Sequence, residues 1–165
     1  MDTVWYAGAE ARIDSLRKAD FTVKAKPGEK VSVKLLRHDF PFGTALAFYG
    51  PDKDSTEKWY RETAKKYFWH AVTENQFKWP EYERKKGKLM KDEMYRYVKF
   101  AEENGWKLRG HAIMWGHQGY GFDKHYSNPQ KPKQCGDFGK YLKARIERDL
   151  KEYKGKIVEY DVWNE

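Results

Sequence analysis

Residues 156–165, Lys-Ile-Val-Glu-Tyr-Asp-Val-Trp-Asn-Glu, have the composition of a buried β-strand that ends in a polar pair. β-Branched and aromatic side chains dominate the stretch, and Gly155 precedes it as a turn residue. Asn164 and Glu165 lie at its carboxyl end, where parallel α/β proteins gather their catalytic and binding groups. The stretch therefore predicts an acid/base site built from an amide and a carboxylate. The simpler alternative is an exposed polar end of a strand.

Upstream of this stretch, strand-like and helix-like segments alternate. Residues 44–47 are predicted to form a short buried strand, and residues 70–73 and 106–114 the second and third strands. Between successive strands, apolar residues recur at helical spacing in segments that begin near residues 54, 92 and 137. Four strands separated by three helices predict parallel βαβ units, and hence an α/β fold.

The first 39 residues have a different pattern, which predicts a lead-in rather than a part of the α/β domain. A short helix is expected near the N-terminus. The alternating segments 21–25 and 31–35 flank a Pro-Gly turn, and this combination predicts a β-hairpin. We therefore expect an N-terminal lead-in with a hairpin at residues 1–39 and the α/β domain at residues 40–165.

The composition restricts the classes of partner. The 165 residues are ordinary for one domain, 35% of them are charged, and the formal net charge is +8. Basic residues are nevertheless interleaved with acidic ones, and the longest cluster is only residues 84–86, so nucleic acid is not an expected partner. No apolar run approaches the length of a membrane span, so a membrane is not expected either. The single cysteine, Cys135, cannot form an intramolecular disulfide.

Polar side chains follow the second, third and fourth predicted strands. These candidate site residues are Glu74, Asn75, Lys78, His111, Trp115, Gln118, Asn164 and Glu165. Taken singly, each has an ordinary structural explanation, but in a β/α barrel all of them would open onto one face. Amides and charged groups bind sugar hydroxyls, and an indole stacks on a sugar ring, so the set favours a carbohydrate site. The spacing of His111, His117 and His125 matches no zinc pattern, and neither a metal nor a cofactor is expected.

Three motifs within this set resemble those of one family. Residues 73–79, Thr-Glu-Asn-Gln-Phe-Lys-Trp, are similar to its T-E-N-x-x-K-W segment, and residues 109–115 are similar to its R-G-H-x-x-x-W segment. Residues 161–165, Asp-Val-Trp-Asn-Glu, are similar to its D-V-x-N-E strand, and residues 42–45 resemble its first barrel strand. The chain thus resembles glycoside hydrolase family 10, the endo-β-1,4-xylanases, and its lead-in is similar to that of plant-type members.

The resemblance implies a (β/α)8 TIM barrel, of which this chain carries about the first four strands. It implies endo-hydrolysis of β-1,4-xylosidic bonds in xylan with retention of configuration. Glu165 matches the general acid/base, and Asn164 matches the residue that binds the 2-hydroxyl of the sugar being cleaved. The six other candidate residues match those that hold the neighbouring sugars. One departure is Gly116, which stands where the family usually has a histidine, with His117 one place later.

The resemblance also implies that this chain carries half of a site. A retaining glycosidase needs two carboxylates about 5–5.5 Å apart, and the family's nucleophile lies near the end of the seventh strand. The isolated chain is therefore expected to be inactive or very weak, with the remaining half of the barrel or another copy of the chain as a partner. Alternatives are a carbohydrate-binding or assembly half-barrel without catalysis, and a related β-1,4-glucanase. An extracellular protein is expected, although no signal peptide is recognisable in the chain.

Overall fold

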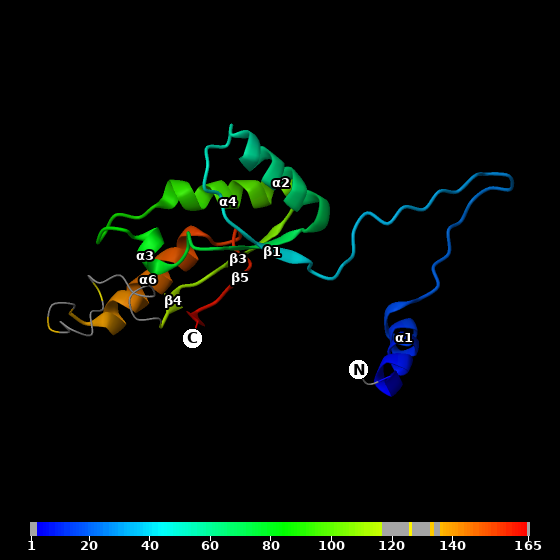
Figure 1. The fold of residues 1–165 in the computed structure, drawn as a ribbon, viewed down its shortest axis with the longest axis horizontal. Coiled ribbons are helices and arrows are strands. Elements are labelled where there is room, and N and C mark those ends of the chain that lie inside the picture. The colour runs from blue at the N-terminus through cyan, green and yellow to red at the C-terminus, as the bar shows by residue number, and fades with distance from the viewer. Residues whose placement is uncertain (1–2, 117–125, 127–132, 134–135, 165) are drawn as a thin grey trace. The chain divides into compact units, whose positions relative to one another are not determined.

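The computed structural model describes residues 3–116, 126, 133 and 136–164 (Figure 1). The chain divides into two compact units, Met1–Arg37 and His38–Glu165. The first unit consists of a helix and an extended segment. The second unit contains all the strands within the described residues.

In the first unit, helix α1 (Thr3–Arg17) precedes an extended segment. The expected turn is present, because the Glu29 amide donates to the Lys26 carbonyl oxygen at 3.0 Å. The expected hairpin is wrong, since residues 18–42 contain no strand. Val23 and Val33 stay about half exposed or more, at 48% and 64%. A two-stranded ribbon without an apolar surface to cover is only marginally stable, which explains why the alternating pattern does not produce paired strands.

The second unit is built on a parallel sheet with the strand order β1–β2–β3–β5. The strands are β1 (Gly43–Leu46), β2 (His70–Thr73), β3 (Lys107–Gly110) and β5 (Glu159–Tyr160). Helices α2 (Ser55–Tyr67), α4 (Lys91–Asn104) and α6 (Phe138–Glu152) connect them, and the short helix α3 (Trp79–Tyr82) follows β2. This succession is the parallel βαβ arrangement that the sequence predicts.

Local signals fix the ends of the connecting helices. The Asp54 carboxylate caps α2 by accepting hydrogen bonds from the amides of Thr56 and Glu57 at 2.8 and 3.1 Å. Gly105 ends α4 in the left-handed conformation, with φ of +63°. None of the helices in the described ranges is both long and apolar enough to cross a membrane.

The third and fourth predicted strands each divide into two pieces. Beyond β3 and β5, strands β4 (Met114–Trp115) and β6 (Trp163–Asn164) form a second parallel pair. Gly110 pairs with Tyr160 and Met114 pairs with Trp163. The segment from β3 to β4 therefore advances four residues where the segment from β5 to β6 advances three. The extra residue amounts to a bulge, a device that redirects side chains beside functional sites. His111 lies within it.

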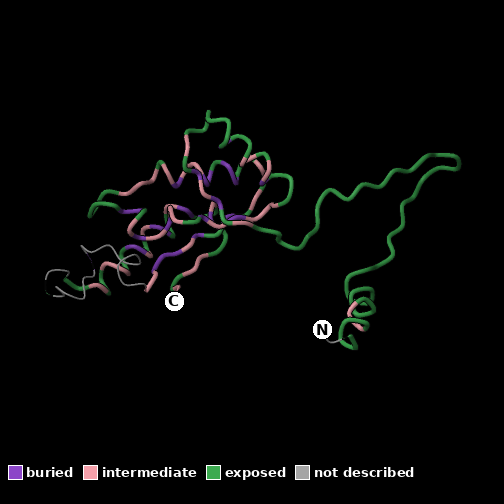
Figure 2. The backbone as a smooth tube through the Cα atoms, viewed as in Figure 1, coloured by how far each residue is buried: buried purple, intermediate pink, exposed green. Residues whose placement is uncertain are grey.

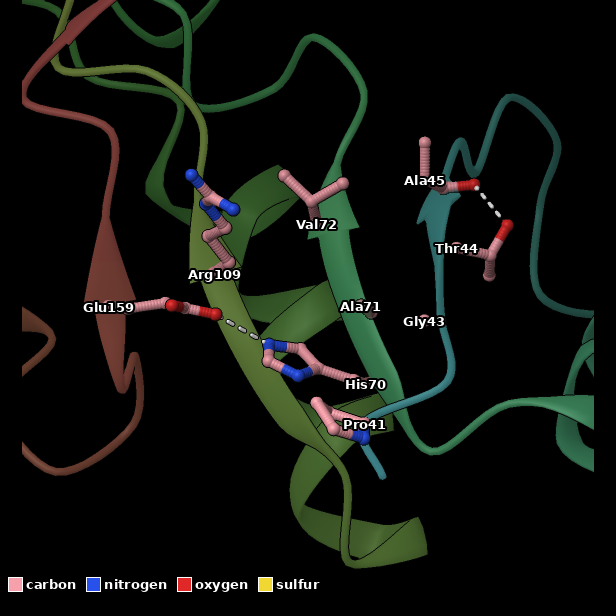
Figure 3. Close-up of a pocket in the computed structure, with 9 residues that line it drawn as sticks. All are labelled: Pro41, Gly43, Thr44, Ala45, His70, Ala71, Val72, Arg109 and Glu159. Carbon is pink, nitrogen blue, oxygen red and sulfur yellow. Dashed lines mark hydrogen bonds and ion pairs between the residues drawn. The ribbon is translucent and has the colours of Figure 1, made fainter. Parts of the chain in front are cut away.

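Successive side chains of a strand point to opposite faces of the sheet. In this chain one face packs against helices and the other is open. Leu46, Ala71 and Leu108 are buried in a core that also contains residues of α4 (Figure 2). On the opposite face, Val72 and Arg109 line an open hollow of about 560 Å³ (Figure 3). The chain therefore has a closed helix-covered face and an open face that carries polar groups.

Candidate functional site

Four of the predicted site residues meet at the carboxyl ends of the strands. Glu74 and Lys78 follow β2, His111 follows β3, and Asn164 ends β6. They share a hollow of about 310 Å³ with four further residues, namely Val72, Thr73, Arg109 and Asp161. The strand-end argument from sequence thus correctly places these four side chains together.

The loop after β2 is held in a compact conformation. The Glu74 amide donates to the Leu46 carbonyl oxygen at 2.9 Å, which extends the pairing of β1 and β2 by one step. Lys78 then donates from Nζ to Asn75 Oδ1 at 3.0 Å. The same ammonium group lies 4.5 Å from the centre of the Trp115 ring, within the range of a cation–π contact. Lys78 therefore connects Asn75 to Trp115, so both of these predicted residues contact a side chain that lines the hollow.

Asp161 contacts both Arg109 and His111, which line the hollow with it. Its Oδ2 lies 2.7 Å from His111 Nδ1, and its Oδ1 accepts a hydrogen bond from Arg109 Nη2. Burial raises the pKa of the Asp161 carboxyl group, but the hydrogen bonds and charges of Arg109 and His111 outweigh this effect and leave the pKa lowered. Asp161 is therefore an anion at neutral pH, and its carboxylate faces the Nδ1 side of the His111 ring.

Arg109 and Asp161 are functional candidates that the sequence reasoning did not select, although both lie in the motifs described above. A usable signal was present. Arg109 follows the buried apolar residue Leu108, and Asp161 lies between Tyr160 and Val162. A charge among apolar residues favours a partner of opposite sign. Because β3 and β5 are neighbours in a parallel sheet, the acidic residues Glu159 and Asp161 were both candidate partners for Arg109, and the structure shows the contact with Asp161.

A second hollow continues along the open face of the sheet (Figure 3). Here His70 Nε2 lies 2.8 Å from Glu159 Oε1, and Arg109 extends from β3 beside this pair. The Arg109 guanidinium group also donates to Asp161. Arg109 lines both hollows. Polar and charged side chains consequently extend along the open face from His70 near the start of β2 to His111 at the carboxyl end.

Two predicted residues, Gln118 and Glu165, lie outside the described residues, as does His117. Gly116 is described, and its amide donates to the Asn164 carbonyl oxygen at 3.1 Å, which prolongs the pairing of β4 and β6. Within the described part of the chain, no group of three His, Cys, Asp or Glu residues is arranged to hold a metal ion. The site offers an amine, an imidazole, carboxylates and an amide around a small open hollow, and these groups match the donors and acceptors of a sugar's hydroxyls.

Comparison with known proteins gives a consistent result. The model of glycosyl hydrolase family 10 matches residues 33–165. An anti-sigma-I factor, RsgI6, from Acetivibrio thermocellus is 36% identical over 121 residues, covering 67% of this chain and 15% of that protein. An endo-1,4-beta-xylanase 5-like protein from Arabidopsis thaliana is 27% identical over 171 residues, covering 98% of this chain and 28% of its own length.

Among solved structures, a mutant of xylanase 10C from Cellvibrio japonicus in complex with xylopentaose is 26% identical, with a TM-score of 0.59. The match covers 76% of this chain and 25% of that one. In each of these three comparisons the chain spans less than a third of the matched protein's length.

Proposed function

Because the chain belongs to glycosyl hydrolase family 10, we propose that it contributes the acid/base half of an enzyme that cleaves β-1,4-xylosidic bonds within xylan, with retention of configuration. The observation that carries the proposal is the meeting of Glu74, Lys78, His111 and Asn164 in one hollow at the carboxyl ends of parallel strands. Glu165, the next residue along the chain, is the proposed general acid/base.

The fold class is established independently of the activity. Family membership and the similarity to xylanase structures confirm the prediction of a (β/α)8 barrel, and the parallel sheet of this chain is part of one. In such barrels the loops at the carboxyl ends of the strands form the active site. The hollow around His111 is at that end.

The contacts around the hollow support the proposed sugar-binding roles. The Lys78 ammonium is fixed by Asn75 and Trp115 and can donate to sugar hydroxyls, while the Glu74 carboxylate can accept from them. The indole of Trp115 offers a flat surface for a sugar ring. We assign Asn164 to the 2-hydroxyl of the sugar at the cleavage point.

The 165-residue chain is not expected to turn over xylan without a second carboxylate. In a retaining mechanism an acid/base and a nucleophile lie about 5–5.5 Å apart. Of the two carboxylates that line the hollow, Asp161 is engaged by Arg109 and His111, and Glu74 is assigned to substrate binding. We propose that the nucleophile is provided by another part of the barrel, either its remaining half or another copy of the chain.

Two measurements on the purified chain test this proposal. Isothermal titration with xylopentaose is expected to show binding, and cellopentaose is expected to bind more weakly because its hydroxymethyl groups must fit near Glu74 and Lys78. Hydrolysis of xylan is expected to be absent from both the wild type and the Glu165→Gln variant. Normal turnover by the wild type would refute the half-site, and a preference for cellopentaose would favour a β-1,4-glucanase.

A second candidate function is carbohydrate binding without cleavage. It is favoured by one observation, the 36% identity to a protein that is named as an anti-sigma factor rather than as a hydrolase. Titration of the chain with xylopentaose followed by prolonged incubation with a complementary barrel half would distinguish the two. Binding of xylopentaose without any hydrolysis after the complementary half is added supports the second candidate. For both candidate functions we propose that the protein acts outside the cell, where xylan is accessible.

A further inference from the structure

One buried cation lies beneath the site and contacts both of the loops that form it. Arg145, on α6, is 1% exposed. Its Nη2 donates to the Phe77 carbonyl oxygen at 2.5 Å and to the Ala112 carbonyl oxygen at 3.3 Å. Phe77 immediately precedes Lys78, and Ala112 immediately follows His111. A single nitrogen atom therefore links the backbone of two loops that arise from different strands.

The surroundings of Arg145 hold its guanidinium group in this position. Its Nε lies 3.2 Å from the carboxylate of Asp149, which is fully buried one turn further along α6. The guanidinium carbon lies 5.4 Å from the centre of the Phe77 ring and 5.1 Å from that of Trp79. Hydrogen bonds from a charged donor are strong in such surroundings, and the planar fork of arginine can reach several acceptors at once.

Arg148, on the same helix, forms an ion pair with Asp149 and provides a comparison for Arg145. Arg148 binds the same carboxylate, with hydrogen bonds of 2.6 and 3.1 Å to Asp149, and its side chain is 33% exposed. Its further contacts are with Glu83 and with the ring of Tyr82. Arg148 thus shares the counter-ion of Arg145, whereas none of these contacts involves the backbone carbonyls beside Lys78 and His111.

We propose that Arg145 is a positioning residue, which fixes the spacing of Lys78 and His111 by joining the carbonyl groups beside them. The inference rests on the proposed function only in assigning these two side chains to sugar binding. It predicts that the two loops depend on Arg145 more strongly than the rest of the domain does. A residue that only stabilised the fold would instead affect all elements alike.

The test compares Arg145→Lys and Arg145→Gln with the matched control Arg148→Lys in the full 165-residue chain. The first readout is amide hydrogen exchange, followed by mass spectrometry, in peptides 74–79 and 109–115, with α4 as the internal reference. We expect both Arg145 variants to raise exchange in the two loops by about tenfold relative to α4, since a charged hydrogen bond is lost at each carbonyl. The control variant is expected to leave that ratio within about twofold.

The second readout is affinity for xylopentaose, which is expected to fall by about tenfold in Arg145→Lys and to be unchanged in the control. If the wild-type chain does not bind xylopentaose, the proposed function fails, while hydrogen exchange still decides the role of Arg145. Equal acceleration of exchange in α4 and in the loops would overturn the positioning role. Failure of both Arg145 variants to fold where the control folds would overturn it as well, because Arg145 would then serve the whole domain.

Discussion

The contacts of Asp161 with Arg109 and His111 give a quantitative prediction about the site. Asp161→Asn keeps the shape of the side chain but removes the charge that faces Arg109 and His111. Two hydrogen bonds with charged groups are lost or weakened, each worth about 1.5–3 kcal/mol when fully buried. The Asp161 side chain is 19% exposed and that of Arg109 is 46% exposed, so solvent screening reduces the expected total to about 2 kcal/mol.

The pH dependence of this loss has a defined sign. The pKa of Asp161 is lowered from the ordinary value of 3.8, because the contributions of Arg109 and His111 exceed the opposing effect of burial. A depressed carboxyl pKa stabilises the folded state above the unfolded-state pKa, and this contribution disappears as the pH falls through the folded-state value. The difference in unfolding free energy between wild type and Asp161→Asn is therefore expected to be present above about pH 5 and to narrow as the pH falls below about 4.

The assay is urea unfolding of the chain, followed by circular dichroism at a series of pH values. Asp52→Asn is the matched control, because Asp52 likewise has two basic partners, Arg61 and Arg96, but is 61% exposed. Its loss is expected to stay below about 1 kcal/mol. The reasoning would be refuted if Asp52→Asn lowered the free energy of unfolding by about 2 kcal/mol. It would also be refuted if the difference between wild type and Asp161→Asn did not decrease at acid pH.

Two further substitutions probe the packing around the hollow. Gly110→Ala would place a Cβ atom 2.7 Å from the Tyr160 ring, so we expect the free energy of unfolding to fall by about 1–3 kcal/mol, as measured by urea titration; an unchanged midpoint would contradict this. Trp115→Ala removes both the proposed sugar platform and the ring beside Lys78, so affinity for xylopentaose is expected to fall about tenfold in a calorimetric titration, with the far-ultraviolet circular dichroism spectrum retained. Unaltered affinity would remove Trp115 from the site.

The order of strands and helices was predictable because each element carries its own hydrophobic period and end signals. The carboxyl ends of parallel strands lie on one edge, so the grouping of Glu74, Lys78, His111 and Asn164 followed from the same pattern. The N-terminal hairpin shows where such reasoning fails. Alternation in residues 21–35 satisfies the local rule for strands, yet the unit contains no surface against which the apolar side chains are buried.

The sequence by itself therefore determined the α/β class, the motifs of the family and the strand-end position of the site, since these depend on residues close together in the chain. Only the tertiary structure decided the bulge at His111, the pairing of Arg109 with Asp161 and the buried contacts of Arg145. Arg109 and Asp161 are 52 positions apart, and Arg145 binds carbonyl groups 33 and 68 positions away. Such partners are chosen by strand register and by the burial of charge, and both are properties of the packed chain rather than of any local stretch.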